Sequence, residues 1–229
     1  AWPQEAALPR VSSFTGGPRL NMVPPKAQAT VLGLTAEQVH AAIAALGMEA
    51  AISYTVAPAE GGVRIQASGQ NAHGSTPEEG HNAQTALLTL LAALPLAVCP
   101  STQAIQTLVL LFRHGDHIGQ VLGVAQSDDL SAGLSLAFTM LTLTGTGCEG
   151  RFDSRTPLCG TDATVRLPAE AALQAAGFTV EGEIDPPHHV PATDPFLQTL
   201  ACAYVLYSGR ESHCIAIGGG TYVHGIPGG

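Results

Sequence analysis

Two histidines and two glutamates stand close together in one short polar stretch, SGQNAHGSTPEEGHNA, at positions 68–83. An apolar run precedes this stretch and another follows it, so it connects a predicted strand to a predicted helix. Imidazoles and carboxylates at such spacing could bind a metal ion, donate a hydrogen bond to a reacting group, or start the helix. Each residue therefore needs its own argument.

The two glutamates fit a helix start. Thr76-Pro77-Glu78-Glu79 is a capping-box pattern, with proline at the first helical position and Glu79 able to reach back to the Thr76 amide. Adjacent carboxylates at a helix start diverge by about 100°, so they cannot easily share one ion. His81 would fall in the first helical turn, where we expect a solvated side chain or one that supports another site residue. The pattern favours capping over metal binding.

His73 is the stronger candidate for chemistry. It follows the predicted strand and precedes Gly74 and Ser75, which let the backbone open. The predicted helix N-terminus beyond them would disfavour a protonated imidazole. A neutral ring held there would be a good hydrogen-bond donor to developing negative charge. A lone histidine is more often structural, so the residues alone leave both roles open.

Three further positions could contact a ligand. Arg155 could clamp a carboxylate or form an ion pair with Asp153 or Glu149. Asn21, where a strand meets a turn, could cap the backbone or bind a substrate carbonyl. The turn Gly218-Gly219-Gly220-Thr221 follows a predicted buried strand, and exposed amides at such turns often receive an anion. No lysine follows this turn, so it is not a phosphate-binding P-loop.

The composition excludes some partners. Among 229 residues the formal net charge is -9 and only one residue is a lysine, so phosphate backbones would be repelled and nucleic acid is not an expected partner. Apolar runs are too short for a membrane span, and the first residues show no secretory signal. Five scattered cysteines without a C-x-x-C pair are typical of reduced thiols. We expect a cytoplasmic globular protein.

The order of elements predicts an α+β fold. Residues 1–100 indicate the order strand, strand, helix, strand, strand, helix, with the first helix after Thr35, ending at Gly47. Residues 101–186 indicate a helix, strands near 120–126, 133–145, 148–156 and 178–185, and a helix over 162–176. We interpret these as two ferredoxin-like α/β sandwiches, each a mainly antiparallel sheet with helices on one face. Residues 187–229 differ in texture, with a helix over 195–207 and a buried strand at 213–221.

Five segments in order carry a resemblance to a known family. They are GGPRLNMVP, ASGQNAHGSTPEEGHNA, LGVAQSDDLSAGLS, FDSRTP and CIAIGGGTYVHG. The chain resembles the PepV-like dipeptidases of the aminoacylase and carnosinase superfamily of co-catalytic zinc exopeptidases. In that family a lid made of two α/β units interrupts the catalytic domain. The resemblance implies that residues 1–186 are the lid, with sub-units of about 1–100 and 101–186, and that residues 187–229 begin the returning catalytic domain.

The resemblance also implies roles for individual residues. His73 matches the lid histidine that donates to the oxyanion of the tetrahedral intermediate, and Asn21 matches an asparagine that holds the substrate. Arg155 matches the arginine that binds the C-terminal carboxylate of a dipeptide. Residues 218–221 match a loop that lines the same pocket. The implied substrate is a dipeptide, and exposed sheet edges suggest a homodimer.

The zinc ligands implied by the resemblance are not found in this chain. The complete family members hold two zinc ions through an early H-x-D, a Glu-Glu pair, a further acidic residue and a late histidine. His114-x-Asp116 and Glu78-Glu79 occur in the reverse order, inside segments that match lid motifs, and His224 comes too early. We expect residues 1–229 to bind no metal and to be inactive alone. The alternative is a non-catalytic ligand-binding or dimerisation module.

Overall fold

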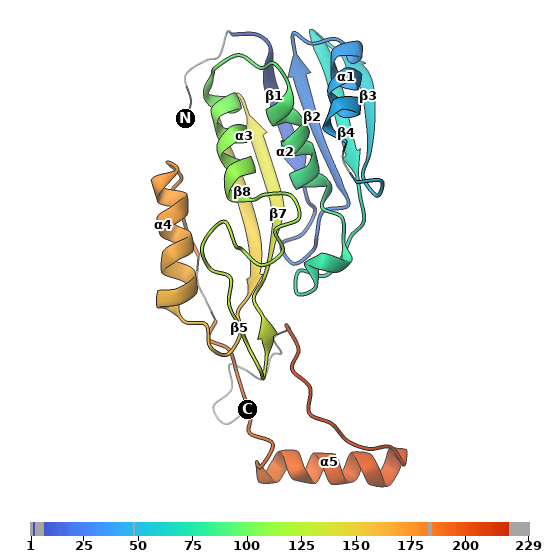
Figure 1. The fold of residues 1–229 in the computed structure, drawn as a ribbon, viewed down its shortest axis with the longest axis vertical. Helices are drawn as coiled ribbons and strands as arrows, with labels where there is room; N and C mark the ends of the chain where they lie inside the picture. Colours follow the sequence, from blue (N-terminus) through green and yellow to red (C-terminus); the bar gives the residue numbers. More distant parts are fainter. Residues whose placement is uncertain (1, 3–6, 48, 183–184, 220–229) are drawn as a thin grey trace.

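One six-stranded antiparallel sheet forms the centre of the protein (Figure 1). The computed structural model describes residue 2 and residues 7–47, 49–182 and 185–219. The strand order is β3-β4-β2-β1-β7-β8. The bounds are β1 Arg10–Gly16, β2 Lys26–Leu32, β3 Ser53–Ala59, β4 Gly62–Ser68, β7 Ser135–Thr144 and β8 Gly147–Arg155. Together with the helices, this sheet confirms the predicted α+β class.

The strands of the two predicted sub-units join in this one sheet. β1 pairs with β2 on one side and with β7 on the other, so Phe14 lies opposite both Ala29 and Leu143. Alternation directs one face of each strand to the core: Val31 is buried, whereas Lys26 is exposed. A short hairpin of β5 (Ser127–Asp128) and β6 (Ala132–Gly133) precedes β7.

Helices α1 (Ala36–Leu46), α2 (Ala83–Ala93) and α3 (Pro100–Leu111) cover one face of the sheet (Figure 1). The predicted ends of α1 are confirmed: Thr35 forms a capping box with Gln38, and Gly47 closes the helix with a positive φ of 60°. The middle helix, α2, packs against strands and helices on several sides, so eight of its eleven residues are buried. Helix α2 therefore contacts α1, α3 and three strands of the sheet.

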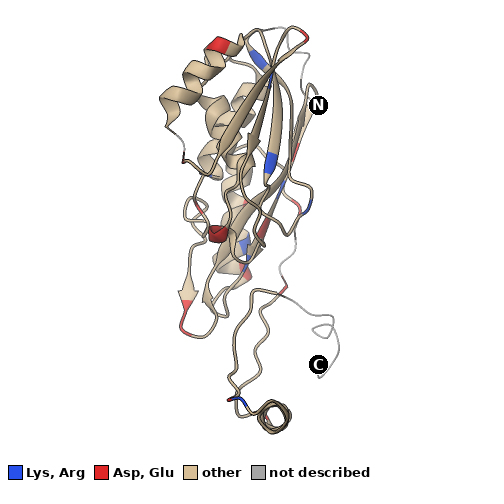
Figure 2. Ribbon diagram, turned by 90° about the vertical axis from the view of Figure 1, so that its right-hand side faces the viewer, with Lys and Arg blue, Asp and Glu red and all other residues tan. Residues whose placement is uncertain are grey.

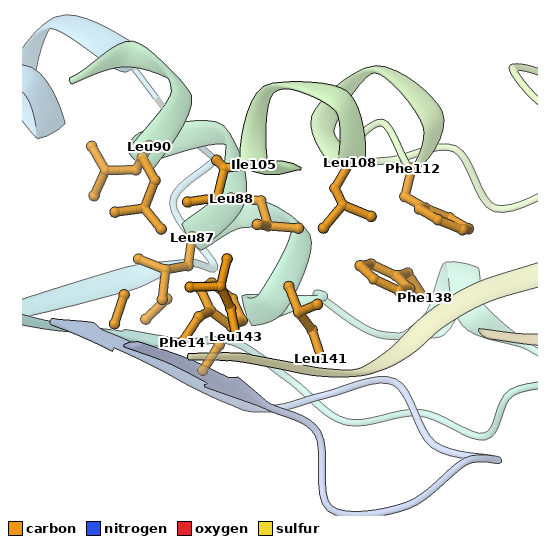
Figure 3. Close-up of a cluster of buried hydrophobic side chains, with 14 of the residues drawn as sticks. Phe14, Leu87, Leu88, Leu90, Ile105, Leu108, Phe112, Phe138, Leu141 and Leu143 are labelled. Carbon is orange, nitrogen blue, oxygen red and sulfur yellow. The ribbon is translucent and has the colours of Figure 1, made fainter. Parts of the chain in front are cut away.

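Aliphatic side chains of α2 interlock with the sheet and with α3 (Figure 3). Leu87 and Leu88 are fully buried and pack in the same cluster as Phe14 and Ile105. The Phe112 ring stacks on Phe138 with 4.2 Å between centroids. Burying each of these large side chains stabilises the fold by about 1.5–3 kcal/mol.

Three predicted strands are wrong for the residues that the structure describes. Residues 120–123 form turns and residues 124–126 have no regular structure, because Gly119 and Gly123 take positive φ and the Asp116 carboxylate accepts hydrogen bonds from nearby backbone amides. Residues 178–182 and 185 are not in a strand, and neither are residues 213–219. A strand requires a partner strand, and neither sheet of the described chain includes these segments.

After β8 the chain leaves the sheet. A turn of π-helix, Asp162–Arg166, leads into α4 (Leu167–Ala175), which stands on the β8 side of the sheet in Figure 1. Helix α5 (Pro195–Ser208) lies well apart from the sheet in Figures 1 and 2, and none of its residues is buried. Within the described residues no helix is long and apolar enough to cross a membrane.

Candidate functional site

The polar stretch after β4 folds into a closed loop rather than a helix start. Gln70 pairs with His81 through both backbone hydrogen bonds, which closes the loop on itself. Inside it, Pro77–Glu79 forms only a 3-10 turn, and Thr76 Oγ1 donates to Glu79 Oε2 instead of capping a helix. Helix α2 begins later, with Asn82 as its cap. The predicted capping box at Thr76 is therefore wrong.

His81 likewise lies before the helix and not in its first turn. Its Nδ1 atom is 3.1 Å from Glu49 Oε1, and the same oxygen is 3.3 Å from His114 Nε2. Burial lowers the pKa of His114. For Glu49, burial opposes ionisation, but hydrogen bonds from His81 and His114 outweigh it and lower the pKa of the carboxyl group. This cluster ties the site loop to the segments after α1 and α3.

The imidazole of His73 is exposed and held in one tautomer. The Ser75 backbone N–H donates to His73 Nδ1 at 3.2 Å, and Ser75 Oγ lies 2.8 Å from the same atom. Because Nδ1 accepts the amide hydrogen, we assign the proton of the neutral ring to Nε2. The expected helix-dipole effect does not apply here, since α2 starts only at Ala83. The ring is nevertheless arranged as a hydrogen-bond donor facing solvent.

Asn21 lies directly beside this histidine. Met22 forms an antiparallel bridge with His73, and the Gly74 N–H donates to the Asn21 carbonyl at 2.8 Å. Asn21 is exposed to solvent. Two predicted site residues more than fifty positions apart are thus joined by the backbone.

Arg155 reaches the same loop from the end of β8. Its Nε and Nη2 atoms donate to Asp153 Oδ2 at 3.1 and 2.9 Å, so the ion pair considered as an alternative is present. A methyl group built on Gly74 would lie 2.1 Å from that same Asp153 oxygen. The carboxylate therefore occupies the space between the guanidinium and the backbone beside His73.

The glycine turn approaches from the C-terminal segment. A methyl group built on Gly218 would lie 2.6 Å from Ser75 Cβ and 3.7 Å from Arg155 Cγ. Gly219 is half-buried nearby in sequence, whereas Gly220 and Thr221 lie outside the described residues. An open groove of about 3260 Å³ is lined by Ser75, Arg155 and Gly218, among many other residues. His73 and Asn21 are not among its lining residues.

The described residues do not fit a zinc pair. No group of three histidine, cysteine or acidic side chains in this part of the chain is placed to hold a metal ion. In the H-x-D sequence, His114 is engaged by Thr85 and Glu49, while Asp116 accepts the amides of its own loop. Glu79 accepts from Thr76. These side chains are turned to structural partners.

Sequence reasoning missed two residues of this region. Asp153 was considered only as an alternative partner for Arg155, and Ser135, whose Oγ donates to the Gly74 carbonyl at 3.1 Å, was not considered. The D-x-R spacing on a strand was a usable signal for Asp153, because side chains two apart share a face. Ser135 gave no such signal, since its contact joins residues 61 positions apart.

Comparison with known proteins confirms the resemblance to dipeptidases. No family model matches the chain. The chain is 27% identical over 214 residues to the Beta-Ala-Xaa dipeptidase of Lactobacillus delbrueckii subsp. lactis, and the alignment covers 93% of this chain and 45% of the relative. The chain is 29% identical over 219 residues to the putative dipeptidase YtjP of Bacillus subtilis, and that alignment covers 95% of this chain and 46% of the relative. A putative dipeptidase of Staphylococcus saprophyticus is 28% identical over 223 residues. The chain spans a little under half the length of these relatives.

Proposed function

We propose that residues 1–186 form the lid of a metal-dependent dipeptidase and that residues 187–229 begin its returning catalytic domain. One observation carries this proposal: Asn21, His73, Arg155 and Gly218, from four distant segments, converge around Gly74 and Ser75. The names of the similar proteins support a dipeptide as the substrate. The exposed apolar helix α5 supports the second part, because such a helix is suited to packing against further protein.

In the proposed reaction the lid holds the dipeptide and steadies the charge that develops on it. Arg155 binds the C-terminal carboxylate through its planar guanidinium, and Asn21 contacts a carbonyl group. The Nε2–H of His73 donates to the oxyanion formed at the scissile carbonyl, which in comparable sites is worth about 2.7–4 kcal/mol of barrier. We place the two zinc ions, their ligands and the general base outside residues 1–229. The chain alone would then be inactive.

The test is steady-state kinetics of the full-length protein whose sequence includes residues 1–229. We expect hydrolysis of dipeptides, weak hydrolysis of tripeptides, and no hydrolysis by residues 1–229 alone. Arg155→Ala should raise KM by about 100-fold while changing kcat less, because it removes a contact made equally in the ground and transition states. A full-length protein that binds dipeptides without cleaving them would contradict the enzyme and favour a non-catalytic binding module.

A homodimer through the sheet edges and a cytoplasmic location complete the proposal. Strands β3 and β8 are the two edges of the six-stranded sheet, and an unpaired edge can add a second sheet. Light scattering after size exclusion should give twice the monomer mass if the edges pair, and the monomer mass would contradict the dimer. All five cysteines are free in the structure, which supports a reducing compartment.

A further inference from the structure

Two ion pairs with the same local geometry follow one another on β8. In the first, Arg151 Nε and Nη2 donate to Glu149 Oε1 at 3.3 and 3.1 Å. In the second, Arg155 Nε and Nη2 donate to Asp153 Oδ2 at 3.1 and 2.9 Å. Both pairs join residues two apart on the strand, so each is dictated by the alternation of side chains. They offer an internal comparison.

Their surroundings differ. The side chains of Arg151 and Glu149 are 59% and 73% exposed, whereas those of Arg155 and Asp153 are 29% and 13% exposed. The first pair is therefore solvated and contributes little to the stability of the fold. The second is confined by the loop that carries His73, so its geometry is fixed by packing as well as by charge.

Gly74 is the point of contact between the second pair and that loop. It is buried, its N–H donates to the Asn21 carbonyl, and its carbonyl accepts from Ser135 Oγ. Only the absence of a side chain lets Asp153 Oδ2 come so close. Asp153 consequently touches both Arg155 and the residue that joins His73 to Asn21.

We propose that Asp153 is a positioning residue that fixes Arg155 relative to His73, with Gly74 as the space it requires. A guanidinium has five N–H groups, and Asp153 takes Nε and one hydrogen of Nη2. The remaining N–H groups are left to grip a ligand carboxylate at a defined distance from the His73 ring. This inference rests on the proposed function, since the ligand is the C-terminal carboxylate of the dipeptide.

The experiment compares a dipeptide with its C-terminal amide in the full-length protein, by kcat/KM. The wild type should prefer the free carboxylate, and Arg155→Ala should remove that preference. Asp153→Ala should reduce the preference by about tenfold, with a smaller loss in Asp153→Asn, because the amide oxygen keeps one acceptor. Glu149→Ala is the matched control and should leave the preference unchanged. Thermal unfolding of each variant separates these effects from misfolding.

A double-mutant cycle sharpens the test. Gly74→Ala should reduce the preference as Asp153→Ala does, because the added methyl displaces the carboxylate. In the Asp153→Ala background the clash with the carboxylate is gone and the nearest remaining contact of the added methyl is the Asn21 backbone carbonyl carbon, at 3.3 Å, so Gly74→Ala should cost at most about twofold more. Additive losses would overturn the positioning role. If the wild type shows no preference at all, the proposed function fails instead, and if Arg155→Ala loses the preference while Asp153→Ala retains it, only the positioning inference fails.

Discussion

Helices with the same kind of N-terminal cap occur in the sheet domain, residues 7–176, and in the C-terminal segment, residues 185–219, but the two helices differ in burial. Helix α2 is capped by Asn82, whose side chain accepts two backbone amides, and α5 is capped by Asp194 in the same way. Yet most of α2 is buried and none of α5 is. Local sequence makes both helices, whereas only the first has a partner to pack against. Capping alone therefore says little about whether a helix supports a fold.

The largest expected effect separates the two regions by burial. Leu88 is 0% exposed in α2, and Leu206 is 77% exposed in α5. Leu88→Ala should lower the free energy of unfolding by about 2–5 kcal/mol, because it leaves a cavity in the core. Leu206→Ala should stay within about 0.5 kcal/mol of the wild type. Urea unfolding of residues 1–229 measures both, and similar losses would show that α5 is packed in solution.

A smaller effect tests the matched caps. Asn82→Ala should cost about 1–2 kcal/mol of unfolding free energy, since the amides of Gln84 and Thr85 lose their acceptor and the Phe138 carbonyl loses one of its donors. Asp194→Ala removes the same two bonds from α5 and should reduce helical circular dichroism without moving the unfolding midpoint. A shared midpoint shift in both variants would mean that the two regions unfold as one unit.

The smallest effect concerns pH. The pKa of His114 is lowered by burial, so its stabilising contribution is complete above its ordinary value of 6.5 and is lost as pH falls. The pKa of Glu49 is also lowered, so its contribution is lost below about 4.5. The sheet domain should therefore lose stability from pH 6.5 downward, and His114→Gln should flatten the upper part of this loss by less than about 1 kcal/mol.

The control for this pH effect lies in the C-terminal segment. His213 and Glu211 form a comparable pair at 3.6 Å, but both side chains are more than 70% exposed. Glu211→Gln should leave the pH dependence of unfolding unchanged. A stability profile that is flat between pH 7 and 4 in the wild type would contradict the role assigned to the Glu49 cluster.

Strands and helices with strong periodicity were predictable from the sequence. The helix after Thr35 and the two strands that follow it appear in the order that alternation and capping predict. Residues 120–126 were misread because the capture of backbone amides by Asp116 is a tertiary detail that apolar content does not reveal. The strand expected at 178–185 is absent from its described residues, 178–182 and 185, for a related reason, since a strand forms only with a partner strand.

The candidate site was predictable as a set of residues but not as an arrangement. His73, Asn21 and Arg155 were singled out from residue type and from the resemblance, and the structure places them around one loop. The sequence did not reveal that Gly74 contacts both the backbone of Asn21 and the carboxylate of Asp153. That role depends on Asp153 and Ser135 approaching one backbone position from other strands.

The central claim is that His73 donates to a developing oxyanion, and the kcat of His73→Ala in the full-length protein tests it most directly. With a good dipeptide substrate, kcat should fall by about 100- to 1000-fold while KM changes little, as for other oxyanion donors. Unchanged unfolding would confirm that the variant is folded. Turnover equal to the wild type would contradict the account.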